Sequence, residues 1–247
     1  MEAARKIRSA VGQVSQLRHA VEADPTLAAS LARVKEFQSR RFAGTYADLL
    51  AGGPYRAAAR FFLDELYSDA KYAERDAQFS RIAGAIEKLF PAAVADTAVA
   101  MAELHALTEE LDQAMALAWL TQDDERLTRV QGYVAAWRSV GRRADRESQL
   151  ATVLAIARRM DRLRRTAGLR MMLKVMRGPA AAAGLGSLQR FLESGFETFS
   201  AMARSSRGLS EFLNTISTRE SALIRVLFEA DLVTCETELA HVLGQAP

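Results

Sequence analysis

The chain has 247 residues, of which 49% are hydrophobic and 26% are charged, a balance typical of a globular protein that is long enough for one large domain. Helix-forming Ala, Leu, Arg and Glu dominate and β-branched residues are sparse, which disfavours a β-sheet. The single cysteine, the absence of a signal-peptide pattern and the lack of a long apolar run predict a cytoplasmic protein without a membrane span, and the Ala/Arg-rich composition indicates a bacterial one.

In the first third of the chain, apolar residues recur at spacings of three and four, which predicts amphipathic helices. Asp24 and Pro25 are typical of a helix start, and Gln38 falls on the buried side of the helix that follows. Thr45 is expected to cap a short third helix. The helices predicted here cover 2–22, 25–42, 45–50 and 55–67.

The rest of the chain continues the helical pattern. Leu111, Met115 and Leu117 are among the expected core residues of its longest helix. Residues 145–176 are expected to form either one long basic helix or a kinked pair that is broken near Gly168. The helices predicted here cover 72–89, 92–120, 123–140, 145–176, 187–203, 209–216 and 217–243. The sequence therefore predicts an all-α fold, a single bundle of about ten helices in one domain, 1–247, with a lobe boundary near 141–146.

Charge is distributed unevenly, although the net charge is only +3. Residues 61–125 carry fourteen acids and four bases, whereas residues 138–177 carry twelve bases and three acids. Blocks of opposite sign predict either an attraction within the fold or two surfaces of different charge.

The densest apolar cluster lies in the helix predicted over 55–67. On a helical wheel its large side chains form one arc, and Glu65 falls inside that arc. A buried carboxylate without a partner costs several kcal/mol, so Glu65 either reaches water, meets an arginine, or faces a ligand pocket. We favour a non-enzymatic protein that holds an apolar or amphipathic small ligand, or a helical protein partner, against this helix. Its predicted binding residues are Tyr46, Phe61, Phe62, Glu65, Leu66 and Tyr67.

This cluster also carries a resemblance. The heptapeptide from Phe61 to Tyr67 is similar to the signature of the bacterial FFLEELY-motif proteins, with Asp64 in place of the first Glu. The segments 41–50, 74–91 and 184–193 resemble the same family. The resemblance implies an uncharacterised helical family to which no activity is assigned.

The basic block contains a stripe of arginines. On a helix, Arg158, Arg162 and Arg165 share one face, which could bind the phosphates of a nucleic acid or an acidic partner. Aromatic residues that would stack on bases are absent from 138–177, so a nucleic acid is the less favoured partner. The competing interpretations are a solvated face and a face that docks on the acidic block.

Little in the sequence indicates catalysis. Glu238 and His241 have a spacing that suits two metal ligands on one helix, but di-iron bundles need a second such pair. His105 could bind haem in a helical fold, and Cys235 has no sequence neighbour that would activate a thiol. We therefore predict no metal, no cofactor and no catalytic residue. A metal- or haem-dependent enzyme is kept as the alternative, and a homodimer is left open.

Overall fold

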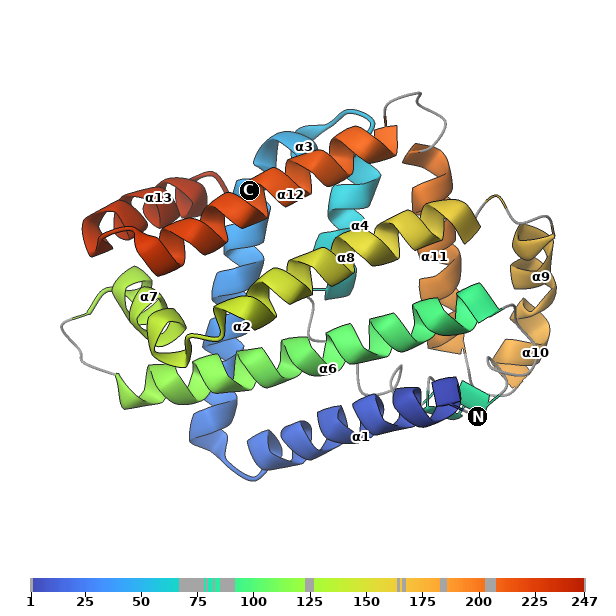
Figure 1. The fold of residues 1–247 in the computed structure, drawn as a ribbon, viewed down its shortest axis with the longest axis horizontal. Coiled ribbons are helices and arrows are strands. Elements are labelled where there is room, and N and C mark those ends of the chain that lie inside the picture. The colour runs from blue at the N-terminus through green and yellow to red at the C-terminus, as the bar shows by residue number, and fades with distance from the viewer. Residues whose placement is uncertain are drawn as a thin grey trace.

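The computed structural model describes residues 2–66, 78, 80–81, 83–84, 92–122, 127–163, 165, 168–182, 186–202 and 208–246. These residues form α-helices and no strand, as the composition predicts (Figure 1). Most of the helix predicted over 72–89 lies outside the described residues. The described helices are α1 (Glu2–Glu22), α2 (Pro25–Thr45), α3 (Ala47–Ala51), α4 (Arg56–Leu66), α6 (Ala92–Thr121), α7 (Arg129–Val140), α8 (Arg143–Leu163), α9 (Leu169–Val175), α10 (Arg177–Ala182), α11 (Gly186–Met202), α12 (Gly208–Glu229) and α13 (Leu232–Gly244).

Four long helices, α1, α6, α8 and α12, lie side by side in that order (Figure 1). Helices α2, α4 and α11 run across this direction; α2 packs on α6, and α11 packs on both α4 and α8. Helices α7 and α13 stand at one end of the molecule, and α9 and α10 stand at the other. The two ends are therefore built from different parts of the sequence.

Helix α6 is the centre of the packing because it contacts α1, α2, α7 and α8. Its contact with α1 uses small side chains, among them Ala98, Ala102 and Ala106, which allow the two helix axes to approach closely. The prediction of Leu117 as a core residue is wrong, because 50% of its surface is exposed. Many of the buried residues of α6 are alanines instead, and a search for large apolar side chains does not find them.

Three predicted helix boundaries are corrected by capping. Thr45 ends α2, and its hydroxyl donates to the carbonyl of Arg41 instead of capping α3. The helix predicted from 123 begins at Arg129, where Thr128 and Gln131 form a capping box. The predicted break near 216 does not exist, since α12 is continuous to Glu229 and Asp231 caps α13.

Two breaks in the second half of the chain take glycine with a positive φ. Gly168 adopts φ of 80° between α8 and α9, which agrees with the broken pair of helices and not with one long basic helix. Gly141 adopts φ of 62° between α7 and α8, and Arg142 follows with φ of 56°. The Arg142 guanidinium donates to Asp145 and Glu110, which holds this less favoured backbone in place. A lobe boundary near 141–146 remains a prediction.

Candidate functional site

Helix α4 places its predicted binding residues against other helices. Phe62 is 7% exposed and its ring meets the edge of Phe212 from α12, with centroids 5.7 Å apart. Phe61 is half-buried, and the position of a Cβ on Gly195 of α11 would lie 3.3 Å from its ring. These rings thus contribute to the core between α4, α11 and α12. The side chains of Glu65 and Leu66, and all of Tyr67, lie outside the described residues.

Tyr46, another of the predicted binding residues, is fully buried and belongs to a network of its own. Its hydroxyl donates to Glu220 of α12 over 2.9 Å, and Arg41 donates to the same oxygen over 2.7 Å. The guanidinium of Arg219 lies over the Tyr46 ring and forms two hydrogen bonds with Asp48, which lowers the pKa of that carboxyl. The network ties the end of α2 to α12 with charge-assisted bonds.

A second polar cluster, which the sequence did not reveal, lies deeper in the fold. Gln38 of α2 donates to Asp112 of α6 over 3.0 Å, and both side chains are buried. One turn earlier on each helix, Lys35 contacts both oxygens of Glu109 at 3.1 and 3.2 Å. Arg146 of α8, also buried, supplies a further positive charge to the cluster. Only Gln38 carried a sequence signal, through its place on the buried stripe of α2.

Burial changes the acidity of this cluster. The pKa of Asp112 rises to about 6 because burial disfavours the carboxylate, and the positive charge of Arg146 opposes that rise only in part. Burial likewise raises the pKa of Tyr133 on α7. Buried groups with shifted pKa values occur at active sites and also in structural networks. At 4% exposure, Asp112 is better placed to fasten α2, α6 and α8 together than to meet a substrate.

We expect the Asp112→Asn variant to change how stability depends on pH. The folded pKa of Asp112 lies above the usual 3.8, so the folded chain holds its proton between these values while the unfolded chain releases it. The folded state is therefore stabilised by the proton on Asp112. This stabilisation is complete below about pH 4 and is lost as the pH rises through 6. Denaturation with urea should show the free energy of unfolding of the wild type falling, relative to the variant, by about 2 to 3 kcal/mol from pH 4 to pH 7.

The matched control is Asp231→Asn. The backbone N–H of Thr234 lowers the pKa of Asp231, so this carboxylate adds stability at higher pH and loses it on acidification. The two substitutions should therefore give pH dependences of opposite sign. A difference between wild type and Asp112→Asn that is constant with pH would contradict the buried carboxylate described above.

The opposite charge blocks meet within the chain, but only in part. Helix α8 packs along α6, and Arg142 at the start of α8 contacts Glu110 of α6 at 2.5 Å. Further along α8, Arg159 reaches only a backbone carbonyl of α6, that of Asp96. Arg158 and Arg162 are exposed and form no ion pair with another described residue, whereas the exposed Arg165 pairs with Asp161. The predicted arginine stripe therefore faces solvent at one end of α8.

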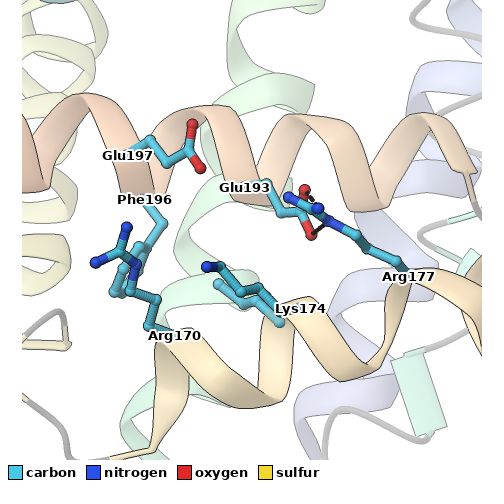
Figure 2. Close-up of a pocket in the computed structure, with 7 residues that line it drawn as sticks. Arg170, Lys174, Arg177, Glu193, Phe196 and Glu197 are labelled. Atoms are coloured by element: carbon cyan, nitrogen blue, oxygen red, sulfur yellow. Dashed lines mark hydrogen bonds and ion pairs between the residues drawn. The ribbon is translucent and has the colours of Figure 1, made fainter.

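Helix α9 carries further exposed cations near the C-terminal end of α8. A shallow pocket lies beside α11, and Figure 2 shows Arg170 and Lys174 of α9 and Arg177 of α10 along its opposite side. Arg177 donates from Nε to both oxygens of Glu193, at 2.7 and 2.9 Å. Arg170 and Lys174 are exposed and form no ion pair among the described residues. We refer to Arg158, Arg162, Arg165, Arg170 and Lys174 as the basic end.

Three of the residues considered for metal binding or catalysis, Cys235, Glu238 and His241, lie on α13. Glu238 and His241 are exposed on α13, and within the described part of the chain no group of three metal-binding side chains is assembled. Cys235 is fully buried, and its thiol donates to the carbonyl of Val226 over 3.2 Å. Burial raises the pKa of this thiol, which is typical of a structural cysteine.

A comparison with protein-family models matches residues 17–233 to the family described as "Domain of unknown function (DUF8198)". The chain belongs to this family. The match to DUF8198 runs from α1 into α13 and thus includes both polar clusters and the basic end. Neither a curated protein nor a solved structure matches the chain.

Proposed function

We propose that this DUF8198 member is a non-catalytic binding protein that recognises an anionic partner through its basic end. The observation that supports this proposal is the difference between the two halves of the basic block. Near the start of α8, Arg142 contacts Glu110, and Arg143 contacts Glu147 and Glu229. The exposed cations Arg158 and Arg162 have no such partner among the described residues.

Unpaired cations in a cluster add nothing to folding, because like charges repel one another. Residues 158–177 carry eight bases and one acid, a net charge of +7 in a chain whose total is +3. Such a local field attracts polyanions and raises their association rate. An anionic partner would supply the counter-charges that the fold does not.

Binding of an apolar ligand or helical partner along 55–67 remains a prediction and is the second candidate. Burial of Phe62 against Phe212 leaves that ring little surface for a ligand. The remaining support for this candidate is Glu65, which falls inside the apolar arc of the helix predicted over 55–67. The resemblance to the FFLEELY-motif proteins, a bacterial origin and a cytoplasmic location are likewise proposals.

The proposal predicts salt-dependent binding to a simple polyanion. We expect wild-type protein to bind a duplex DNA probe with an affinity that falls steeply with salt, and Arg158→Glu with Arg162→Glu to reduce that slope. Each cation that neutralises a phosphate contributes about 0.9 to the slope of log K against log salt concentration, so the slope should drop by about 2. Fluorescence anisotropy at several salt concentrations measures it.

The control reverses two exposed arginines elsewhere, Arg40 on α2 and Arg225 on α12. This variant has the same net charge as the first, so a loss confined to the first locates the binding surface. Equal losses in the two variants would show that only net charge matters. Wild-type protein that binds neither this probe nor any other anionic surface at low salt would overturn the proposal.

A further inference from the structure

The segment formed by α9 and α10 exposes apolar side chains. Met171 and Val175 are each 65% exposed, and Met176 is 36% exposed. Pro179 and Ala182, on α10, are exposed as well. Single exposed apolar residues are common, but a run of them on one short segment marks a contact surface.

The exposed arc of α9 has two edges of different chemistry. Arg170 and Lys174 are four residues apart and share one edge, whereas Met171 and Val175 are four apart and share the other. At about 100° per residue, the two edges are adjacent on the helix surface. Figure 2 shows the cationic edge, where Arg170 and Lys174 extend from α9 toward α11. The two residues of α9 between these edges in the sequence, Met172 and Leu173, are partly buried.

The rest of the basic end is near this arc. Five residues separate the end of α8 from the start of α9, and the C-terminal part of α8 lies with α9 at the end of the molecule opposite α7 and α13 (Figure 1). The exposed cations of α8, Arg158 and Arg162, therefore belong to the same end as the apolar edge of α9. Cations and aliphatic side chains thus occur together on the exposed arc of α9, and the exposed cations of α8 lie at the same end of the molecule.

We propose that this surface binds an anionic lipid bilayer, with the cations on the headgroups and the methyl groups of Met171 and Val175 between them. The inference rests on the proposed function and names the source of the anionic groups. An amphipathic helix with basic residues beside apolar ones is the usual device for lying in a membrane interface. None of the described helices is long and apolar enough to cross a bilayer, so the contact is peripheral.

Other anionic partners fit the surface less well. A nucleic acid would use the cations but gains nothing from exposed Met171 and Val175, and α9 offers no aromatic side chain for base stacking. A groove in a partner protein usually takes apolar residues over at least two helical turns, at i, i+4 and i+7, and α9 ends after seven residues. A bilayer requires only shallow insertion over a small area.

The test is co-sedimentation of the full chain with vesicles of phosphatidylcholine, alone or with one third phosphatidylglycerol. We expect binding only to the anionic vesicles. Met171→Gln with Val175→Gln keeps every charge and removes only the apolar edge, and it should weaken vesicle binding by about tenfold. Arg170→Gln with Lys174→Gln should weaken it by about 30-fold, since each cation near an anionic membrane contributes about 1 kcal/mol.

The matched control is Leu232→Gln with Val233→Gln, which removes exposed apolar side chains at the start of α13, at the other end of the molecule. It should bind vesicles as the wild type does, and circular dichroism checks that each variant is folded. Duplex DNA binding by the Met171 and Val175 variant should equal that of the wild type.

The outcomes separate the two proposals. The lipid inference is overturned if the protein binds DNA but not vesicles, or if the Met171 and Val175 substitutions leave vesicle binding unchanged. In both cases the proposal that the basic end binds an anionic partner is retained. Loss of binding in the Leu232 and Val233 control to the same extent as in the Met171 and Val175 variant also overturns it. Absence of binding to both probes overturns both proposals.

Discussion

The Gly44→Ala variant should lose about 2 to 3 kcal/mol of its free energy of unfolding. Gly44 lies where α2 crosses α13, and a Cβ at this position would fall 1.8 Å from the backbone oxygen of Val242. A backbone atom cannot rotate away as a side chain can, so α13 would have to shift off α2. That shift would disturb the packing of the buried Leu239 and Cys235 on α13. Urea denaturation followed by circular dichroism measures the loss.

Gly12→Ala is the matched control. Gly12 also lies inside a helix, α1, but no atom lies within 4 Å of the position that its Cβ would take. Alanine is the better helix former, so this variant should gain up to about 1 kcal/mol. If Gly44→Ala were as stable as Gly12→Ala, the close contact between α2 and α13 would be refuted. In Gly44→Ala, faster hydrogen exchange that is confined to the backbone amides of α13 would show that the loss of stability begins in this helix.

The Arg146→Ala variant should lose about 3 to 5 kcal/mol at pH 7, the usual cost of removing one member of a buried charge pair. Arg146 is 5% exposed, and its guanidinium carbon lies 4.3 Å from the centre of the Trp137 ring. It is also the strongest of the positive charges that lower the pKa of Asp112. Its removal leaves a buried carboxylate with less compensation and opens space beside Trp137. Equilibrium unfolding at neutral pH tests this.

The control is Arg143→Ala, three residues away on the same helix. Arg143 pairs with Glu147 and Glu229, but all three side chains are about half exposed. Exposed pairs contribute about 1 kcal/mol or less, so this variant should be nearly as stable as the wild type. Addition of Asp112→Asn to Arg146→Ala should restore part of the loss, because it removes the uncompensated charge. Equal effects of the two alanine variants, or no restoration, would contradict the coupling.

The sequence predicted the helices well where apolar periodicity and breakers agree. The stripe of α1 has Ile7, Val11 and Val14 buried, as their spacing indicates. Asp24 caps α2 through hydrogen bonds to Thr26 and Leu27, and Gly168 separates α8 from α9. These features depend on a few neighbouring residues, so local chemistry is sufficient to specify them.

The polar clusters could not be predicted because their partners are distant in the chain. Gln38 and Asp112 are 74 residues apart, and Arg41 and Glu220 are 179 apart. A carboxylate in a helical sequence has the same pattern whether it faces water or a buried arginine from another helix. The sequence therefore showed Gln38 on a buried stripe but gave no sign of Asp112, Glu109 or Arg146.

Some properties of the basic end follow from the sequence, and others depend on the tertiary structure. The net charge of residues 158–177 and the shared face of Arg158, Arg162 and Arg165 follow from the sequence alone. Whether a charge remains available for a partner depends on which helix packs beside it, and that is a property of the tertiary structure. Packing of α8 on α6 pairs Arg142 with Glu110 and leaves Arg158 and Arg162 exposed, and the packing of α9 leaves Met171 and Val175 exposed. Local periodicity determined the helices, and contacts between distant helices decided which charges remain exposed.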